Sequence, residues 1–479
     1  MRKYVAFIAT ALLGCGLLGL SVTAADFEGG ELFGTIISDK TGYIDLARDK
    51  TVGTYTSAEI SATPFRYMVL SWNSDTPKGT MLRIEAKVRV NGRWSDWLFL
   101  GSWSTDGDKS SAGPLDMSGD DIAYADVDTL TVRGDDGETA DAYAYRLSLF
   151  SVEPGVTPSV RMIKTAFRND LPGQEIQRQG DIPKEELDAF TGTLDVKPLA
   201  QTTRDPQFAN VICSPVSAAM VLDYHGVHIL PEMAAMGVFD RAYDGYGNWA
   251  FNAAFIGSCG LESYVIYCAD FDDVKLELMA GNPVICSVKY KQSNKVTRNL
   301  PVIDAAPIEF TNGHLLVVVG YERRDGKTYV VVNDPAAATD GEVRRLYEES
   351  QFIEAWEATG RVAYITHNTG IDLSEPLITD ALLAPTSRTT EQDGVLLYEY
   401  MLTDTDKDVI SAAKAVSPDG ERIQTGVTIV AWDEALGAVH SYAIPAEGPG
   451  LWLNADQAGQ TVYVFLGTGN YYRVSRGRE

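Results

Sequence analysis

Residues 81–90 alternate between apolar and polar side chains, and this period-two pattern predicts a half-buried β-strand. One side of the strand carries Leu82, Ile84, Ala86, Val88 and Val90. Asn91 and Gly92 then form a favourable hairpin turn into a second strand. Further strands of this kind are expected at 93–100, 129–132 and 142–150. With no long helical period between them, these strands predict a β-sandwich domain over residues 26–155.

The pattern then changes to a mixture of helical and strand periods, which predicts an α+β domain over residues 196–368. Helices are expected at 213–226, 251–256 and 271–280, and strands at 284–288, 315–320 and 329–332. Residues 156–195 carry Pro, Gly and charged side chains and are predicted to form a linker. Residues 376–479 return to strand patterns separated by Asp and Gly turns, which predicts a C-terminal β-sandwich-like domain. We therefore expect a multidomain chain with an α+β core flanked by two β domains.

The N-terminus has a basic start, a long apolar run and then small residues, a pattern that predicts an export signal over residues 1–25. Cleavage is expected after Ala24 or Ala25. No other stretch reaches the ~18 apolar residues that span a bilayer, so we expect a secreted protein with no transmembrane segment. An alternative is that 12–15, Leu-Leu-Gly-Cys, is a lipoprotein cleavage site, which would leave the protein lipid-anchored at Cys15.

The charge balance excludes two classes of partner. The chain has 40 Lys and Arg residues against 66 Asp and Glu residues, and its net charge is −26. Nucleic-acid phosphates and anionic lipids both require a basic surface, so neither is expected as a ligand. An acidic surface instead favours encounter with basic peptides.

Candidate chemistry lies at three element boundaries. Cys213 precedes a predicted helix with Pro215 in its first turn, and a helix N-terminus stabilises a thiolate. His314 opens one apolar strand, and Asp334 follows the end of the next. A cysteine before a helix, a histidine at a strand start and a carboxylate after the following strand is an order typical of papain-like thiol hydrolases. A buried, inert cysteine is the alternative interpretation of Cys213 alone.

With these motifs, residues 196–367 resemble the C39 peptidase family and its relatives, papain-like cysteine peptidases named for cleaving bacteriocin leaders after a double glycine. Four motifs carry the resemblance: Pro198-Leu199-Ala200-Gln201, Cys213-Ser214-Pro215, Asn312-Gly313-His314 and Asn333-Asp334-Pro335-Ala336. The segment 243–252 looks like a signature of the secreted members. Many relatives have glycine after the cysteine, and we interpret Ser214 as a mark of a subfamily.

The resemblance implies that Cys213 is the nucleophile and that His314 is its general base and later its general acid. Asp334 would orient the imidazole and stabilise its charged form. Asn333 is the alternative orienting residue, because papain uses an amide in this role. The family pattern favours Asp334.

An oxyanion formed on the attacked carbonyl needs two donors, and the resemblance implies the backbone N–H of Cys213 and a glutamine side chain. Gln201 stands in the Pro-Leu-Ala-Gln context of the secreted relatives and is preferred. Gln207 is the alternative, because it lies six residues before the cysteine, as in papain.

The other cysteines and the five histidines show no spacing that indicates a zinc site, and we expect neither a metal nor a cofactor. Cys259 and Cys268 could pair across a hairpin, whereas Cys286 lies in a buried-strand pattern. His225 and His228 follow a helix C-terminus and are interpreted as structural.

The predicted N-terminal sandwich is rich in tryptophan, at positions 72, 94, 97 and 103. Core packing is the expected role of these rings, and stacking on a glycan is the alternative. Contact with glycans or the cell envelope through either β domain therefore stays open.

Together these observations predict a secreted cysteine peptidase that hydrolyses peptide bonds in peptide or protein substrates. Two alternatives use the same residues differently. The papain-like core could be retained as a non-catalytic scaffold for binding or adhesion, or it could transfer the acyl group to an amine instead of water.

Overall fold

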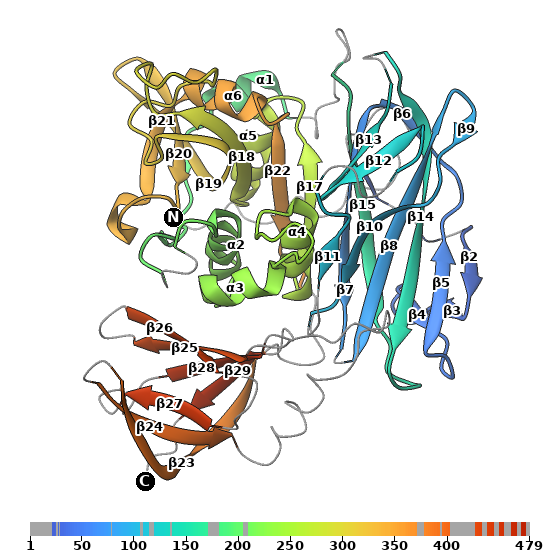
Figure 1. Ribbon diagram of the computed structural model, residues 1–479. Helices are drawn as coiled ribbons and strands as arrows, with labels where there is room; N and C mark the ends of the chain where they lie inside the picture. Colours follow the sequence, from blue (N-terminus) through green and yellow to red (C-terminus); the bar gives the residue numbers. More distant parts are fainter. Residues whose placement is uncertain are drawn as a thin grey trace, which may run out of the picture.

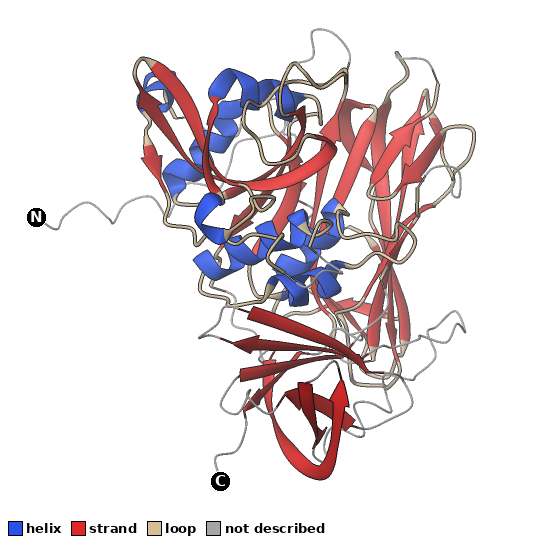
Figure 2. Cartoon of the chain, turned by 60° about the vertical axis from the view of Figure 1, so that its left-hand side comes forward, coloured by secondary structure: helices blue, strands red, loops and turns tan. Residues whose placement is uncertain are grey.

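The fold is described from a computed structural model. It describes residues 22–24, 27, 29–77, 79–105, 109–114, 119–134, 137–170, 182–204 and 209–370, together with the backbone of the strands between 378 and 475. The architecture is mostly β, with several sheets and few helices, as Figure 2 shows. The fold predicted from the sequence is confirmed in this coarse form. The predicted export signal falls outside the described residues, except for Val22–Ala24, which forms β1.

Two stacked sheets make up the N-terminal part of the chain (Figure 1). The strands of the first are β1 (Val22–Ala24), β3 (Thr35–Ile37), β4 (Ile44–Leu46), β7 (Tyr67–Asp75), β12 (Ala123–Asp126), β13 (Thr129–Val132) and β15 (Ser159–Arg168). Those of the second are β2 (Glu31–Phe33), β5 (Val52–Thr56), β6 (Ile60–Phe65), β8 (Thr80–Val90), β9 (Arg93–Trp94), β10 (Leu98–Trp103), β11 (Ser110–Ser111) and β14 (Ala140–Ser151). Their orders are β12-β13-β7-β15-β4-β3, with β1 beside β15, and β11-β10-β8-β14-β5-β2, with β6 beside β14 and β9 beside β8.

The alternation over 81–90 produces β8 as expected. Its apolar side is buried, from Leu82 at 0% exposure to Val90 at 6%. Asn91 and Gly92 both have positive φ angles, 51° and 79°, so the chain turns tightly into β9.

The predicted linker over 156–195 needs correction. Residues Ser159–Arg168 form β15, which pairs with β7 along its whole length in the interior of the first sheet. Turn residues do flank this strand in the sequence. The strand itself has buried apolar side chains and pairs with β7, which is distant in the sequence. Residues 184–189 and 192–193 are also ordered, as α1 and β16. The other predicted domain limits stay predictions.

A third sheet and all of the helices that the structure describes lie in residues 184–367. Its strands are β16 (Gly192–Thr193), β17 (Glu262–Tyr267), β18 (Val284–Lys291), β19 (Phe310–Arg324), β20 (Lys327–Asn333), β21 (Arg344–Glu348) and β22 (Val362–His367). The helices are α1 (Lys184–Ala189), α2 (Cys213–Tyr224), α3 (Pro231–Val238), α4 (Trp249–Ser258), α5 (Phe271–Ala280), the 3₁₀ helix η1 (Asp340–Glu342) and α6 (Glu349–Glu357). The sheet order is β17-β22-β18-β19-β20-β21, with β16 beside β19.

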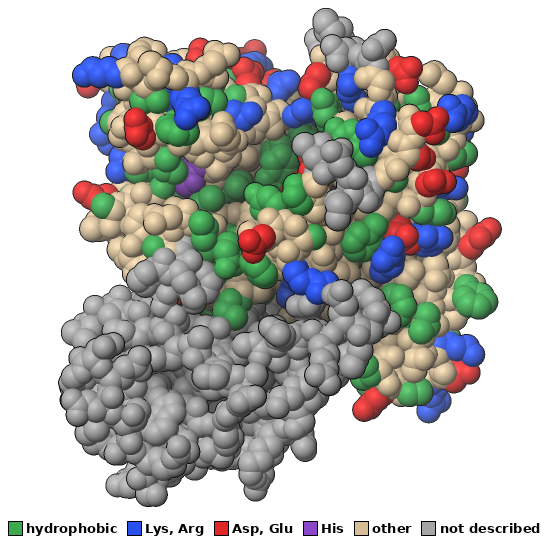
Figure 3. All heavy atoms as spheres, viewed as in Figure 1, with side chains coloured by type: hydrophobic (Ala, Val, Ile, Leu, Met, Phe, Trp, Pro, Cys, Tyr) green, Lys and Arg blue, Asp and Glu red, His purple; other side chains and the backbone are tan. Residues whose placement is uncertain are grey.

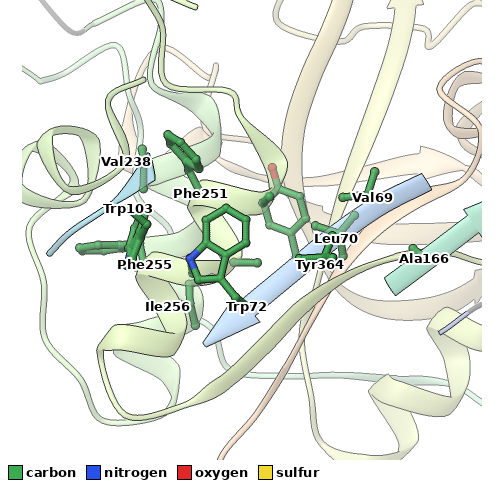
Figure 4. Packing of buried hydrophobic residues seen from close by; sticks show 14 of the residues in the cluster. Val69, Leu70, Trp72, Trp103, Ala166, Val238, Phe251, Phe255, Ile256 and Tyr364 are labelled. Atoms are coloured by element: carbon green, nitrogen blue, oxygen red, sulfur yellow. The ribbon is translucent and has the colours of Figure 1, made fainter. Parts of the chain in front are cut away.

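Both N-terminal sheets contact the helix and strand of residues 249–267, the first through β7 and the second through Trp103. Trp72 on β7 and Trp103 on β10 both contact Phe251 of α4 edge-on, with ring centroids 5.9 and 5.6 Å away (Figure 4). Asn73 Nδ2 donates to the backbone carbonyl of Ser263 at 2.8 Å, and the Ser263 N–H donates back to Asn73 Oδ1 at 3.0 Å. Because β7 faces the second sheet on one side and α4 on the other, nearly all of it is buried.

The two buried tryptophans confirm core packing for part of the tryptophan set. Trp94 and Trp97 differ, since each is half-buried and lies beside the Lys87 ammonium, with Nζ 4.7 and 4.8 Å from the ring centroids. A glycan role for this second pair stays untested.

Residues 378–475 contribute a fourth sheet in the order β26-β25-β28-β29-β23-β24-β27, in which β23 and β29 run parallel. Its strands are β23 (Ile378–Gln392), β24 (Val395–Leu402), β25 (Val427–Asp433), β26 (Ala438–Ile444), β27 (Gly450–Asn454), β28 (Thr461–Leu466) and β29 (Tyr471–Ser475). In the described part of the chain, no helix has the length and apolar character needed to cross a bilayer.

Candidate active site

Helix α2 presents Cys213 at its first residue. The following residues, from Ser214 to Leu222, are all buried, so the helix is fixed in the core while its first turn faces the site. Cys213 itself stays partly exposed. The N–H groups of a first helical turn have no intrahelical acceptors, and together with the helix dipole they favour negative charge on the sulfur.

His314 and Asp334 come from neighbouring strands of the third sheet. His314 lies in β19, and Asp334 directly follows the end of β20, which pairs antiparallel with β19. The Nε2–H of His314 donates to Asp334 Oδ1 at 2.8 Å, and both side chains are almost fully buried. Because Nε2 is engaged by the carboxylate, Nδ1 is the nitrogen left for Cys213.

The three groups shift one another's pKa values. Burial would raise the pKa of the Cys213 thiol, but the hydrogen bond with His314 and its positive charge outweigh burial and lower this pKa. Burial would lower the pKa of His314, but the negative charge of Asp334 raises it to about 10. The Asp334 pKa is likewise lowered, because His314 outweighs the effect of burial. The arrangement therefore favours a thiolate, an imidazolium and a carboxylate at neutral pH.

Two tyrosines that the sequence did not single out complete this cluster. The Tyr347 hydroxyl on β21 donates to Asp334 Oδ2 at 2.6 Å. The Tyr290 ring on β18 lies edge-on to His314, with centroids 6.3 Å apart. Both occur in ordinary strand patterns, so only the pairing of distant strands brings them to the site.

Asn333, the alternative to Asp334, points to different partners. Its Nδ2 donates to the backbone carbonyl of Val196 at 3.1 Å, and its Oδ1 accepts from Arg344 Nε at 2.6 Å. Residue 333 is the last of a strand, where successive side chains face opposite sides. The contact with His314 is made by Asp334.

Gln201 is held close to this cluster by its backbone. Its N–H donates to the carbonyl of Pro335, the residue after Asp334, at 2.7 Å. The side chain is 4% exposed, and its Oε1 has no hydrogen-bond partner within the described residues. Gln207 lies outside the described residues.

The segment 243–252 forms the end of the loop before α4 and the first residues of that helix. Asn248 caps α4, because its Oδ1 accepts from the N–H of Phe251 at 3.0 Å. Its Nδ2 donates to Asp240 Oδ2 at 2.8 Å. Asn248 is 1% exposed and is therefore a structural residue, whereas Trp249 is only half-buried.

The remaining described cysteines are free thiols, so the possible bridge between Cys259 and Cys268 is absent from the structure. Each lies in the core, and burial raises the pKa of Cys259 to about 12. Burial also raises the pKa values of Cys268 and Cys286, so Cys213 alone among these four thiols has a lowered pKa. His228 contacts Asp223 at the end of α2, as expected for a structural residue.

The fold and the site thus define a β-rich protein with a cysteine, histidine and aspartate grouped where a helix meets a sheet. Comparison with known families finds two matches. Residues 193–364 match the Peptidase_C39 like family, and residues 22–167 match the Peptidase C39 N-terminal domain of actinobacterial type. The chain therefore contains a domain of the C39-like peptidase family preceded by a C39 N-terminal domain.

Searches among individual proteins add two similar structures. A Bacillus anthracis protein described as a candidate C39-like peptidase is 16% identical, with a TM-score of 0.29, covering 39% of this chain and 100% of that one. A procathepsin B from Trypanosoma congolense is 14% identical, with a TM-score of 0.25, covering 41% of this chain and 84% of that one. No curated protein matches the chain. The family assignment therefore rests on the two family matches.

Proposed function

We propose that this protein is a secreted cysteine peptidase that hydrolyses peptide bonds on a papain-like α+β core, with Cys213, His314 and Asp334 as its triad. The observation that carries the proposal is the charged cluster at the start of α2. A buried histidine that contacts Asp334 lowers the pKa of a partly exposed cysteine, although burial alone would raise it. Export of the chain belongs to the same proposal and rests on the apolar N-terminal run.

In this mechanism the Cys213 thiolate attacks the scissile carbonyl, and the carbonyl π-electrons move to its oxygen. The resulting oxyanion is stabilised by the backbone N–H of Cys213, which has no intrahelical acceptor at the first helical position. The second donor is Gln201 Nε2. Support for Gln201 comes from its backbone bond beside Asp334.

Collapse of the oxyanion breaks the C–N bond, and His314 Nδ1 gives its proton to the leaving amine. Neutral His314 then takes a proton from water, whose oxygen attacks the thioester and releases the acid. Throughout, Asp334 keeps Nε2 engaged, so the ring cannot rotate away from Cys213. Tyr347 holds the other carboxylate oxygen and fixes the direction of Asp334.

The test is cleavage of a diverse peptide library by the exported protein and by the Cys213→Ala variant, with mass spectrometry of the products. We expect the wild type to cut a subset of peptides and Cys213→Ala to cut none while keeping its unfolding midpoint. Cys286→Ala, which removes a buried thiol with a raised pKa, is the matched control and should retain cleavage.

Each alternative has its own outcome. Incorporation of an amine into the acyl half of the peptide, in place of hydrolysis, would select acyl transfer. Absence of both reactions would select the non-catalytic scaffold and overturn the proposal. N-terminal sequencing of exported protein tests the signal, since a lipid on Cys15 would replace a start at Ala25 or Asp26.

A further inference from the structure

The loop between α3 and α4, residues 239–248, carries an exposed aromatic ring on a rigid base. Asp240 and Gly245 exchange two backbone hydrogen bonds, at 2.9 and 3.3 Å, so the loop closes on itself. Asp240 is 0% exposed, whereas Tyr243 at the tip is 42% exposed. A large ring outside the core on such a constrained loop is available for contact with a ligand.

The N-terminal sheets hold the base of this loop. Asp240 Oδ1 accepts a hydrogen bond from the backbone N–H of Ser111, at the end of β11, at 2.9 Å. The same oxygen accepts from the N–H of Tyr243 at 3.3 Å, while Oδ2 accepts from Asn248 at 2.8 Å. One buried carboxylate therefore joins the N-terminal sheets, the tip of the loop and the start of α4.

A second contact comes from the turn between β12 and β13. Asp128 Oδ2 accepts from the N–H of Trp249, the first residue of α4, at 2.6 Å. The preceding Val127 has φ +53°, a left-handed conformation that a β-branched residue rarely adopts. The N–H of Val127 donates to the carbonyl of Gly113 at 3.0 Å, and this bond helps to maintain the strained turn.

The loop joins α3 to α4, and both of these helices pack against α2, the helix that begins at Cys213. Burial raises the pKa of Tyr243, and the negative charges of Asp128 and Cys213 raise it further. Burial also raises the pKa of Tyr364, and the charges of Asp128 and Cys213 raise it further. The Tyr364 hydroxyl lies 3.1 Å from Ser214 Oγ, next to the cysteine. In Figure 3, hydrophobic side chains gather in the middle of the face shown, between the peptidase segment and the N-terminal sheets.

We propose that Tyr243 forms a wall of the substrate cleft and contacts a peptide side chain beside the scissile bond, and that the N-terminal sheets position it through Ser111 and Asp128. Asp128 is a positioning residue, because it acts on the loop through Trp249. This inference rests on the proposed function, since it assumes that Cys213 reacts with peptides. The N-terminal domain is then a part of the substrate site and not only an appendage.

The test compares two electrophiles at Cys213 in the full-length protein, iodoacetamide and a set of dipeptidyl vinyl sulfones. The rate of reaction with iodoacetamide depends on the Cys213 thiolate alone, whereas the rate with the peptidyl reagents also depends on their binding in the substrate cleft. We expect Tyr243→Ala to lower the ratio of the peptidyl rate to the iodoacetamide rate about tenfold, and Tyr243→Phe to keep it within about twofold. Tyr43→Ala, at a half-buried tyrosine of the N-terminal sheets, is the matched control and should leave the ratio unchanged.

For the positioning role, Asp128→Ala should lower the same ratio about fivefold, because α4 loses an acceptor at its first N–H. Asp128→Asn keeps an acceptor oxygen there and should restore the ratio. An unchanged iodoacetamide rate shows that the triad is intact in each variant.

The outcomes separate the two proposals. An unchanged ratio in Tyr243→Ala overturns the substrate wall, and an unchanged ratio in Asp128→Ala overturns the role of the N-terminal sheets. Slow iodoacetamide labelling of Cys213 in the wild type overturns the proposed function instead. Rapid iodoacetamide labelling with no reaction toward any peptidyl reagent overturns both.

Discussion

Replacing Tyr347 with Phe removes one hydroxyl group from the most buried part of the site. That hydroxyl lies 2.6 Å from Asp334 Oδ2, and it is the partner that the structure describes for this oxygen, while His314 engages Oδ1. The variant leaves a fully buried carboxylate oxygen without its donor and keeps the ring in place.

The expected size follows from the charge of the acceptor. A hydrogen bond to a buried charged group contributes about 1.5–3 kcal/mol, so the free energy of unfolding should fall by about that amount. The loss acts on the charged form of Asp334, and its pKa should therefore rise. Asp334 would still be ionised at pH 7, so the reactivity of Cys213 should change little there.

The effect should emerge at acid pH. Once Asp334 is protonated, its negative charge no longer stabilises the His314 imidazolium. Without that positive charge beside it, the Cys213 thiolate is no longer stabilised and the sulfur takes up a proton. The rate at which iodoacetamide alkylates Cys213 should be measured from pH 4 to 8 (about the range over which these groups titrate). As the pH is lowered, this rate should begin to fall at a higher pH in Tyr347→Phe than in the wild type, so the acid limb of the profile is shifted. Tyr329→Phe, on the neighbouring strand β20, is the matched control. A Tyr347→Phe protein with wild-type stability and a wild-type acid limb would refute the reasoning.

Three further predictions concern the whole fold. In the folded state the Cys213 pKa is lowered, and the His314 pKa is raised from 6.5 to about 10; the stability that Cys213 contributes should be lost as pH falls through its lowered pKa, and the stability that His314 contributes should be lost as pH rises from about 6.5 towards 10, which urea unfolding midpoints across this pH range will show. Trp72→Ala should reduce the free energy of unfolding by about 3–5 kcal/mol, because it opens a cavity against Phe251, and an unchanged urea midpoint would contradict that packing. Titration of the exported protein with a chromogenic disulfide should find one reactive thiol when folded and four in denaturant; two or more when folded would contradict the burial of the other three.

The sequence correctly predicted those elements that are determined by interactions between residues close together in the chain. The alternation over 81–90 and its Asn91-Gly92 turn reappear as β8 and its hairpin. The helix predicted over 271–280 has those bounds in α5, and Gly281 ends it in the left-handed conformation. Cys213 and Asp334 could be named because each stands at the boundary of such an element. The sequence also places His314 at a strand start, but β19 already begins at Phe310.

Contacts between distant strands could not be predicted in this way. The segment that contains β15 has turn signals on both sides and resembles a linker, yet β7 pairs with it. Tyr347 reaches Asp334 only because β21 pairs with β20, a register that no short pattern encodes. For the same reason, nothing in the sequence near Trp72 indicates that its ring contacts both Trp103 of the second sheet and Phe251 of α4.

The central claim is that His314 keeps Cys213 as a thiolate at neutral pH. It is tested most directly by the pH dependence of iodoacetamide labelling at each cysteine, resolved by mass spectrometry in the wild type and in His314→Gln. The account predicts that Cys213 reacts faster than the buried cysteines at pH 6, well below the ordinary thiol pKa of about 8.5, and that His314→Gln loses this advantage. A Cys213 that becomes reactive only near that ordinary pKa, with or without His314, would contradict it.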